Sequence, residues 1–247
     1  MRNILIAGAS RGLGKYVFNQ LSNTDNYVIG ISRSGDNDTI MCDINSPSGI
    51  DRLTSSIQPI THFVCTAGVY GPLGPFHENS FDDWQFALRT NLFGPARIAH
   101  ALIPNMIKNG YGKIVFLSGG GATRAMYGAS SYGASKSGLV RFAETLAHEL
   151  WDYNIDVNCV APGAMNTEFL ERALAAGPEA IGDEFYKQCE TQKEFGGVNF
   201  DIPASLIKFL LSSDSDNISG KLISAVWDNW LDTPRGLSNK YTLRREV

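Results

Sequence analysis

The chain has 247 residues, of which 21 are basic and 25 acidic, and its composition is 43% hydrophobic. One sizeable core fits this composition, whereas the acidic balance argues against a nucleic-acid-binding protein, which normally carries a basic face. No apolar run reaches the roughly 18 residues of a membrane span, and the N-terminus turns polar too early for a secretory signal. The four cysteines lack the spacing of a disulfide scaffold or a zinc site. We therefore expect a cytoplasmic protein without membrane or metal partners.

Short apolar segments rich in β-branched residues recur along the chain and predict strands. Each is mostly apolar throughout, rather than alternating, which is typical of strands buried on both faces of a parallel sheet. They cover residues 3–7, 27–31, 61–65, 113–117, 155–160 and 222–226, with a weaker seventh at 39–42.

Segments with helical spacing lie between these strands. They cover residues 13–21, 47–57, 81–108, 130–151 and 202–211, and we expect Pro95 and Pro104 to bend or break the longest. The alternation predicts one doubly wound α/β domain over residues 1–247, with a mostly or fully parallel sheet of about seven strands. Residues 164–200 and the extension 227–247 fall outside the pattern.

A glycine-rich turn of spacing GxxxGxG follows the first strand and opens the first helix. Glycines let the backbone approach a pyrophosphate closely, and the helix N-terminus offers free N–H groups and partial positive charge. The turn therefore predicts a dinucleotide site, although glycine-rich turns without a ligand are also common. Its residues are Gly8, Ser10, Arg11, Gly12, Leu13 and Gly14.

The end of the second strand bears on the choice of cofactor. An acidic side chain there would bind an adenosine ribose and favour NAD(H), but the chain has Ser32 and Arg33. Arg33 can pair with a 2′-phosphate, and Arg11 lies near the same corner. This favours NADP(H) over NAD(H); the alternative is a solvated loop charge, with Asp36 and Asp38 nearby.

Tyr132 is the only tyrosine with a lysine four residues later, Lys136. On a helix the two side chains share a face, and a nearby positive charge lowers the pKa of a tyrosine from about 10. Tyr132 is therefore a candidate acid or base near neutral pH. Its helix follows the strand 113–117, which ends in Ser118.

Taken together, these motifs resemble the short-chain dehydrogenase/reductase family from about residue 3 to residue 226. The resemblance rests on AGASRGLG at 7–14, CDI at 42–44, CTAG at 65–68, Asn91, LSGGGA at 117–122, YGASK at 132–136 and VAPGAMNT at 160–167. It implies a Rossmann-like three-layer αβα sandwich.

The resemblance also implies roles for individual residues. Tyr132 would transfer the proton, Lys136 would lower the pKa of Tyr132 and hold the nicotinamide ribose, Asn91 would support a water relay, and Ser118 would hydrogen-bond the carbonyl. The remaining residues implied to border the cofactor are Asp43 and Ile44 at the adenine, Thr66, Ala67 and Gly68 at the adenosine ribose, and Pro162, Gly163, Met165 and Thr167 on the nicotinamide side.

Three departures from the family pattern stand out. The position thirteen residues before Tyr132, where the family has its serine, is Gly119, so Ser118 serves only if the loop 119–121 carries one extra residue. CTAG replaces NNAG, exchanging two amides for a thiol and a hydroxyl. The usual Asp-Gly-Gly ending is absent.

We therefore expect NADPH-dependent reduction of a ketone or other carbonyl to a secondary alcohol, with Tyr132 as general acid. Two alternatives stay open: an alcohol dehydrogenase acting on a sugar or polyol, and a catalytically silent NADP-binding regulatory protein. Substrate choice should come from loops 70–76, 123–127 and 164–200, the last as a lid of two short helices. The resemblance implies a homodimer or homotetramer through the helices 81–108 and 130–151.

Overall fold

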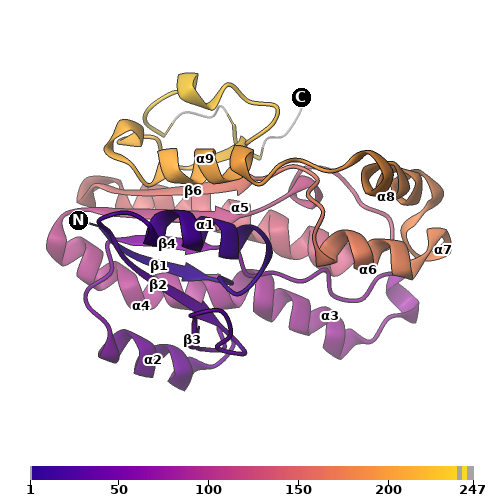
Figure 1. Ribbon diagram of the computed structural model, residues 1–247, viewed down its shortest axis with the longest axis horizontal. Coiled ribbons are helices and arrows are strands. Elements are labelled where there is room, and N and C mark those ends of the chain that lie inside the picture. The colour runs from indigo at the N-terminus through magenta and orange to yellow at the C-terminus, as the bar shows by residue number, and fades with distance from the viewer. Residues whose placement is uncertain (1, 238–240, 244–247) are drawn as a thin grey trace.

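The computed structural model describes residues 2–237 and 241–243. Within them, seven strands form one fully parallel sheet in the order β3-β2-β1-β4-β5-β6-β7 (Figure 1). This confirms the predicted doubly wound sheet. The strands are β1 (Asn3–Ala7), β2 (Tyr27–Ser32), β3 (Ile40–Met41), β4 (His62–Cys65), β5 (Gly112–Leu117), β6 (Ile155–Ala161) and β7 (Lys221–Ser224).

Two helix layers cover the sheet, which is why its strands are apolar on both faces. Along β4, Phe63 and Cys65 face one core cluster while Val64 faces the other. The first cluster includes helices α2 (Pro47–Ser56), α4 (Gly94–Asn109) and α5 (Ser130–Leu150), and the second α1 (Gly12–Ser22) and α9 (Asp201–Leu210). No helix in the described part of the chain combines the length and apolarity needed to cross a membrane.

The long helix predicted over 81–108 is divided just before Pro95, but not at Pro104. α3 (Phe81–Leu88) passes into a π-helical turn, Arg89–Phe93, and then into α4. The Gly94 N–H donates to the Arg89 carbonyl, five residues back. Because Pro95 has no N–H, the Asn91 carbonyl cannot accept the regular bond from four residues ahead. Pro104 lies inside α4 without ending it.

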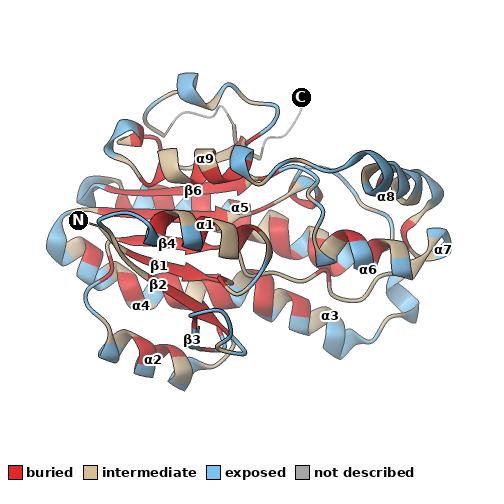
Figure 2. Ribbon diagram, in the orientation of Figure 1, coloured by how far each residue is buried: buried red, intermediate tan, exposed pale blue. Residues whose placement is uncertain are grey.

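The segment 164–200 contains three helices rather than the predicted two: α6 (Glu168–Ala176), α7 (Pro178–Ile181) and α8 (Asp183–Phe195). Gly177 and Gly182 separate them with φ of 80° and 81°, which glycine adopts without strain. Helix α7 has four residues, too few for a periodic pattern to show. Figure 2 shows α8 largely exposed at one end of the molecule.

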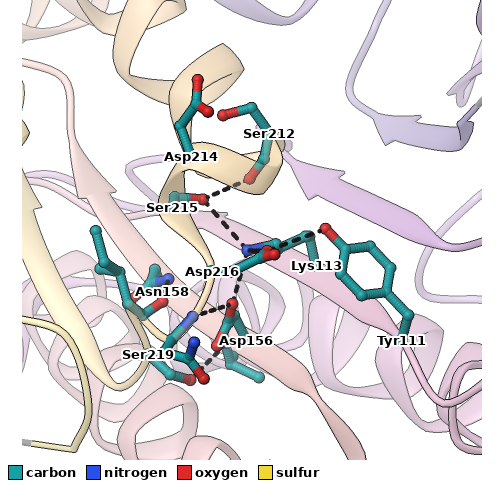
Figure 3. Close-up of polar contacts among 12 residues, drawn as sticks. Tyr111, Lys113, Asp156, Asn158, Ser212, Asp214, Ser215, Asp216 and Ser219 are labelled. Carbon is teal, nitrogen blue, oxygen red and sulfur yellow. Dashed lines mark hydrogen bonds and ion pairs between the residues drawn. The ribbon is translucent and has the colours of Figure 1, made fainter.

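A buried charge network lies at the amino-terminal edge of the sheet (Figure 3). Lys113 is only 1% exposed, and its Nζ lies 2.7 Å from a carboxylate oxygen of Asp156 and 2.7 Å from one of Asp216. It also donates to Ser215 Oγ at 3.3 Å, and the Tyr111 hydroxyl donates to Asp216 at 3.2 Å. Burial of such charges is tolerated because they are paired and hydrogen-bonded.

Near this network, the buried imidazole of His62 makes stability depend on pH. Burial first, and then the positive charges of Arg2 and Lys113, lower the pKa of His62 from 6.5 to about 4. Since the unfolded chain binds the proton at a higher pH than the folded chain, stability is fully present above pH 6.5 and falls as the pH decreases towards 4. The loss reaches roughly 3 kcal/mol.

Urea unfolding at a series of pH values between 4 and 7 measures this loss. His62→Phe is expected to remove most of the slope, whereas His100→Phe, at an exposed position of α4, is expected to retain it. Equal slopes in both variants would contradict the assignment.

Candidate active site

The carboxyl ends of the central strands bring the predicted site residues to one edge of the sheet. Gly8 follows β1, Thr66 follows β4, Ser118 follows β5 and Pro162 follows β6. In open parallel sheets the crevice outside these strand ends is where ligands bind.

The glycine turn is packed too tightly for side chains. A Cβ on Gly8, whose φ is 87°, would lie 2.7 Å from the Ala67 nitrogen, and a Cβ on Gly14 would collide with the Gly8 carbonyl oxygen. Thr66 stabilises the glycine turn, because its Oγ1 donates to the Ala7 carbonyl at 2.9 Å. The hydroxyl of CTAG thus supplies a turn-stabilising hydrogen bond.

Helix α1 begins at this turn and presents its N-terminus to the crevice. Its N-cap, Arg11, is extended and makes no side-chain capping bond, and the first N–H groups of a helix have no acceptor within the helix. Leu13 and Gly14 are buried beneath them. Free N–H groups, positive helix-dipole charge and a side-chain-free turn fit the diphosphate of a dinucleotide.

The two arginines predicted to read the 2′-phosphate differ in their surroundings. Arg33 is exposed on the loop after β2, whereas Arg11 forms an ion pair with Glu168 at the start of α6. Ser32 Oγ lies 2.7 Å from Thr39 Oγ1 and organises this loop.

The loop after β2 is hydrogen-bonded to the glycine turn and to α1 through Asn37. The Asn37 side-chain amide donates to the Ser10 carbonyl at 2.9 Å, and Lys15 Nζ donates to Asn37 Oδ1 at 2.9 Å. These hydrogen bonds hold the side chains of Lys15 and Asn37 beside the predicted 2′-phosphate site.

The other predicted cofactor residues border the crevice on both sides. Asp43 is exposed and accepts from the Asn45 N–H at 2.9 Å, while Ile44 is buried against Gly94. Pro162 and Gly163 follow β6, and a Cβ on Gly163 would meet Val198 and Val226, each at 2.8 Å. Met165 packs against the core cluster of α1 and α9.

Asn91, Lys136 and Gly68 meet at the centre of the site. A Cβ on Gly68 would lie 3.3 Å from Asn91 Oδ1 and 3.4 Å from Lys136 Nζ. Asn91 accepts from the Val69 N–H and donates to the Val69 carbonyl, both at 2.8 Å, and also donates to Ser135 Oγ at 2.9 Å. The divided helix therefore carries Asn91 into the loop after β4.

Burial controls the protonation of Tyr132 and Lys136. It raises the pKa of Tyr132 to about 12 and lowers the pKa of Lys136 to about 8. Lys136 Nζ donates to the Leu117 carbonyl at 2.7 Å and lies 5.9 Å from the centre of the Tyr132 ring. In this structure desolvation shifts the Tyr132 pKa upward, which is opposite to the direction expected from Lys136. The role of Lys136 in lowering the pKa of Tyr132 stays a prediction.

The glycine loop after Ser118 lies against Tyr132. A Cβ on Gly119 would lie 2.7 Å from the Tyr132 hydroxyl oxygen, and a Cβ on Gly121 would lie 2.8 Å from the Tyr132 ring. Ser118 is buried at the end of β5, and its Oγ has no hydrogen-bond partner among the described residues. A side-chain-free backbone thus occupies the position thirteen residues before Tyr132.

Two aromatic rings beside Tyr132 were not among the predicted site residues. Tyr70 and Phe169 have ring centroids 5.0 and 6.1 Å from that of Tyr132, and they lie 4.6 Å from each other. Burial raises the pKa of Tyr70. Both residues lie in segments expected to select substrate, but periodicity gave no indication that they contact Tyr132. Among the described residues, no group of three His, Cys, Asp or Glu side chains is placed to hold a metal ion.

Comparison with known proteins agrees with this geometry. Residues 2–176 match the family model described as short chain dehydrogenase. The chain is 30% identical to the 3-oxoacyl-[acyl-carrier-protein] reductase FabG of Buchnera aphidicola, over 89% of this chain and 93% of that protein.

Solved structures show the same fold. A short chain dehydrogenase/reductase from Saccharomyces cerevisiae is 25% identical, with 94% of this chain and 99% of that chain covered and a TM-score of 0.83. The actinorhodin polyketide ketoreductase, solved as a variant with NADPH, is 21% identical, with 90% and 95% covered and a TM-score of 0.80.

Proposed function

The chain belongs to the short-chain dehydrogenase/reductase family of NAD(P)-dependent oxidoreductases, and we propose that it uses NADPH to reduce a ketone or other carbonyl to a secondary alcohol. The observation that carries the proposal is the buried Tyr132 with Lys136 Nζ 5.9 Å from its ring centre, and with Lys136 and Asn91 meeting at Gly68 at the carboxyl edge of the sheet. The similarity to a 3-oxoacyl-[acyl-carrier-protein] reductase supports a carbonyl substrate.

The residues of the chain provide position, charge and the proton. A bound nicotinamide cofactor supplies the hydride. Because the pKa of Tyr132 is raised to about 12, its hydroxyl is protonated at neutral pH and can donate to the substrate oxygen as negative charge develops there. Protonated tyrosine is the form that carbonyl reduction requires.

Lys136, Asn91 and Ser118 support that donor in different ways. Lys136 supplies positive charge and is oriented by the Leu117 carbonyl. Asn91 fixes the loop after β4 through Val69. The buried Ser118 Oγ has an unused hydrogen-bonding capacity, and we propose that it stabilises the substrate oxygen as a weak oxyanion donor.

Arg33 supports the choice of NADPH, and its replacement tests that choice. Loss of a charge-assisted bond to the 2′-phosphate is expected to make Arg33→Asp bind NADPH about 10- to 100-fold more weakly, with a much smaller effect on NADH. Fluorescence titration of both cofactors measures the change. Arg52→Asp, at an exposed position of α2, is the matched control, and equal weakening of NADPH and NADH in Arg33→Asp would contradict the role.

The reaction itself is tested by following NADPH consumption with a panel of carbonyl compounds, including 3-oxoacyl thioesters, cyclic diketones and keto sugars. Turnover of a carbonyl that depends on Tyr132 is the expected result. Tight NADPH binding without turnover of any carbonyl would instead favour a silent NADP-binding protein. Oxidation of sugars or polyols alone would favour the dehydrogenase alternative.

We further propose a cytoplasmic homodimer or homotetramer. All four cysteines are free and buried, as is usual in a reducing compartment. Exposed phenylalanines at positions 81, 86 and 93 lie on the segment expected to join the subunits. Sedimentation velocity of the full chain tests the assembly.

A further inference from the structure

The first turn of α6 lies on the glycine turn. Thr167, the residue before α6, has its Cγ2 3.8 Å from the place that a Cβ on Gly12 would occupy. The next residue, Glu168, pairs through Oε2 with Arg11 Nη1. Two consecutive residues of the lid therefore contact the turn expected to bind the cofactor phosphates.

The ion pair between Arg11 and Glu168 involves a guanidinium that is predicted to bind the cofactor. Arg11 is one of the two arginines at the predicted 2′-phosphate corner, and planar guanidinium groups bind carboxylates and phosphates with the same donors. The Glu168 carboxylate therefore binds guanidinium donors of Arg11 that a cofactor phosphate would otherwise use. The Arg11 side chain is 64% exposed and that of Glu168 47%, so the pair is open to exchange with an anion from solution.

The two cofactors differ in what they require of this pair. NADH has no 2′-phosphate, so it can bind while Arg11 and Glu168 remain paired. NADPH must share Arg11 with the carboxylate or displace it, and its phosphate then lies near a second negative charge. Competition and repulsion by Glu168 therefore weaken the binding of NADPH, which carries the 2′-phosphate, but not that of NADH.

We propose that Glu168 is a specificity-determining residue that weakens NADPH binding relative to NADH by competing for Arg11. The proposal rests on the proposed use of NADP(H). Because the same competition acts on NADP⁺, Glu168 also favours release of the spent cofactor, a step that limits turnover in many enzymes of this kind.

The surroundings of the pair provide a matched control. Glu171 belongs to the same turn of α6 and is also exposed, and no ion pair of Glu171 is found within the described residues. Lys15, on α1, donates to Asn37 Oδ1 rather than to Glu168 or Glu171. Glu168→Gln and Glu171→Gln therefore remove the same charge from the same turn, but only the first releases Arg11.

Fluorescence titration of the full chain with NADPH and with NADH tests the proposal. An exposed pair of this kind predicts that Glu168→Gln binds NADPH about two- to fivefold more tightly, while its NADH affinity and that of Glu171→Gln for both cofactors stay unchanged. In the Arg11→Gln background, Glu168→Gln should have no effect, as a double-mutant cycle requires. The gain should shrink at about 0.5 M salt, where screening is strong.

Three results would overturn the role of Glu168. They are an unchanged or weaker NADPH affinity in Glu168→Gln, an equal gain for NADH, or an undiminished gain without Arg11. Glu168→Ala provides a second removal of the carboxylate if the glutamine variant loses thermal stability. A wild-type chain that binds NADH but not NADPH would refute the proposed use of NADPH itself, whereas NADPH binding unaffected by Glu168→Gln would refute only this inference.

Discussion

Tyr132→Phe is expected to lower kcat for carbonyl reduction by a factor of about 10² to 10⁴, the usual contribution of a positioned general acid. The substitution removes only the hydroxyl oxygen, so the ring contacts with Tyr70 and Phe169 remain. The Kd for NADPH should therefore change little, while single-turnover reduction becomes slow. Stopped-flow measurement of NADPH oxidation with the best carbonyl of the panel separates chemistry from binding.

Tyr153→Phe is the control for this variant. Tyr153 lies directly after α5, outside the loops expected to select substrate, and is 45% exposed, so the same loss of a hydroxyl there should leave kcat unchanged. A Tyr132→Phe enzyme with wild-type kcat would show that another group donates the proton. Loss of NADPH binding together with kcat would indicate a structural rather than a catalytic role.

Lys113→Met is expected to cost about 3–5 kcal/mol of stability, because it leaves the buried carboxylate of Asp156 without its cation. Asp156 lies beside Lys113 on the neighbouring strand and is also buried, so its negative charge would lose its partner. Guanidinium unfolding monitored by circular dichroism measures the loss. Replacing the exposed Lys108 with Met removes a lysine of the same size and should cost little.

A second variant tests whether pairing is the cause. Lys113→Met combined with Asp156→Leu removes both buried charges and should recover part of the lost stability, since apolar replacements of buried ion pairs are often tolerated. If the double variant is less stable than Lys113→Met by the full cost of Asp156→Leu alone, the two residues act independently.

The strands and the motif residues were predictable because their signals are local. Mostly apolar runs such as 3–7 correspond to strands that are buried almost throughout, and the glycine turn is recognisable from its spacing alone. The prediction of a doubly wound parallel sheet needed only the alternation of these runs with helical segments.

The remaining features depend on contacts that spacing does not encode. Pro95 was expected to bend or break its helix, but the sequence did not indicate that the missing N–H would be accommodated as a π-helical turn at Arg89–Phe93. The raised pKa of Tyr132 follows from burial, whereas the sequence indicated only the lysine. Likewise, the pairing of Arg11 with Glu168 joins positions 157 residues apart (168 minus 11).

Strand β5 places Lys113 near one end and Ser118 just beyond the other, five residues away. At the rise of an extended chain these positions are about 16 Å apart, and substitutions at such separations usually have additive effects on stability. Changes around Lys113 can therefore compensate for unfavourable mutations in the substrate loops without altering the chemistry. Proteins of this architecture can therefore change substrate through destabilising mutations in these loops, while stabilising substitutions near Lys113 keep the chain folded.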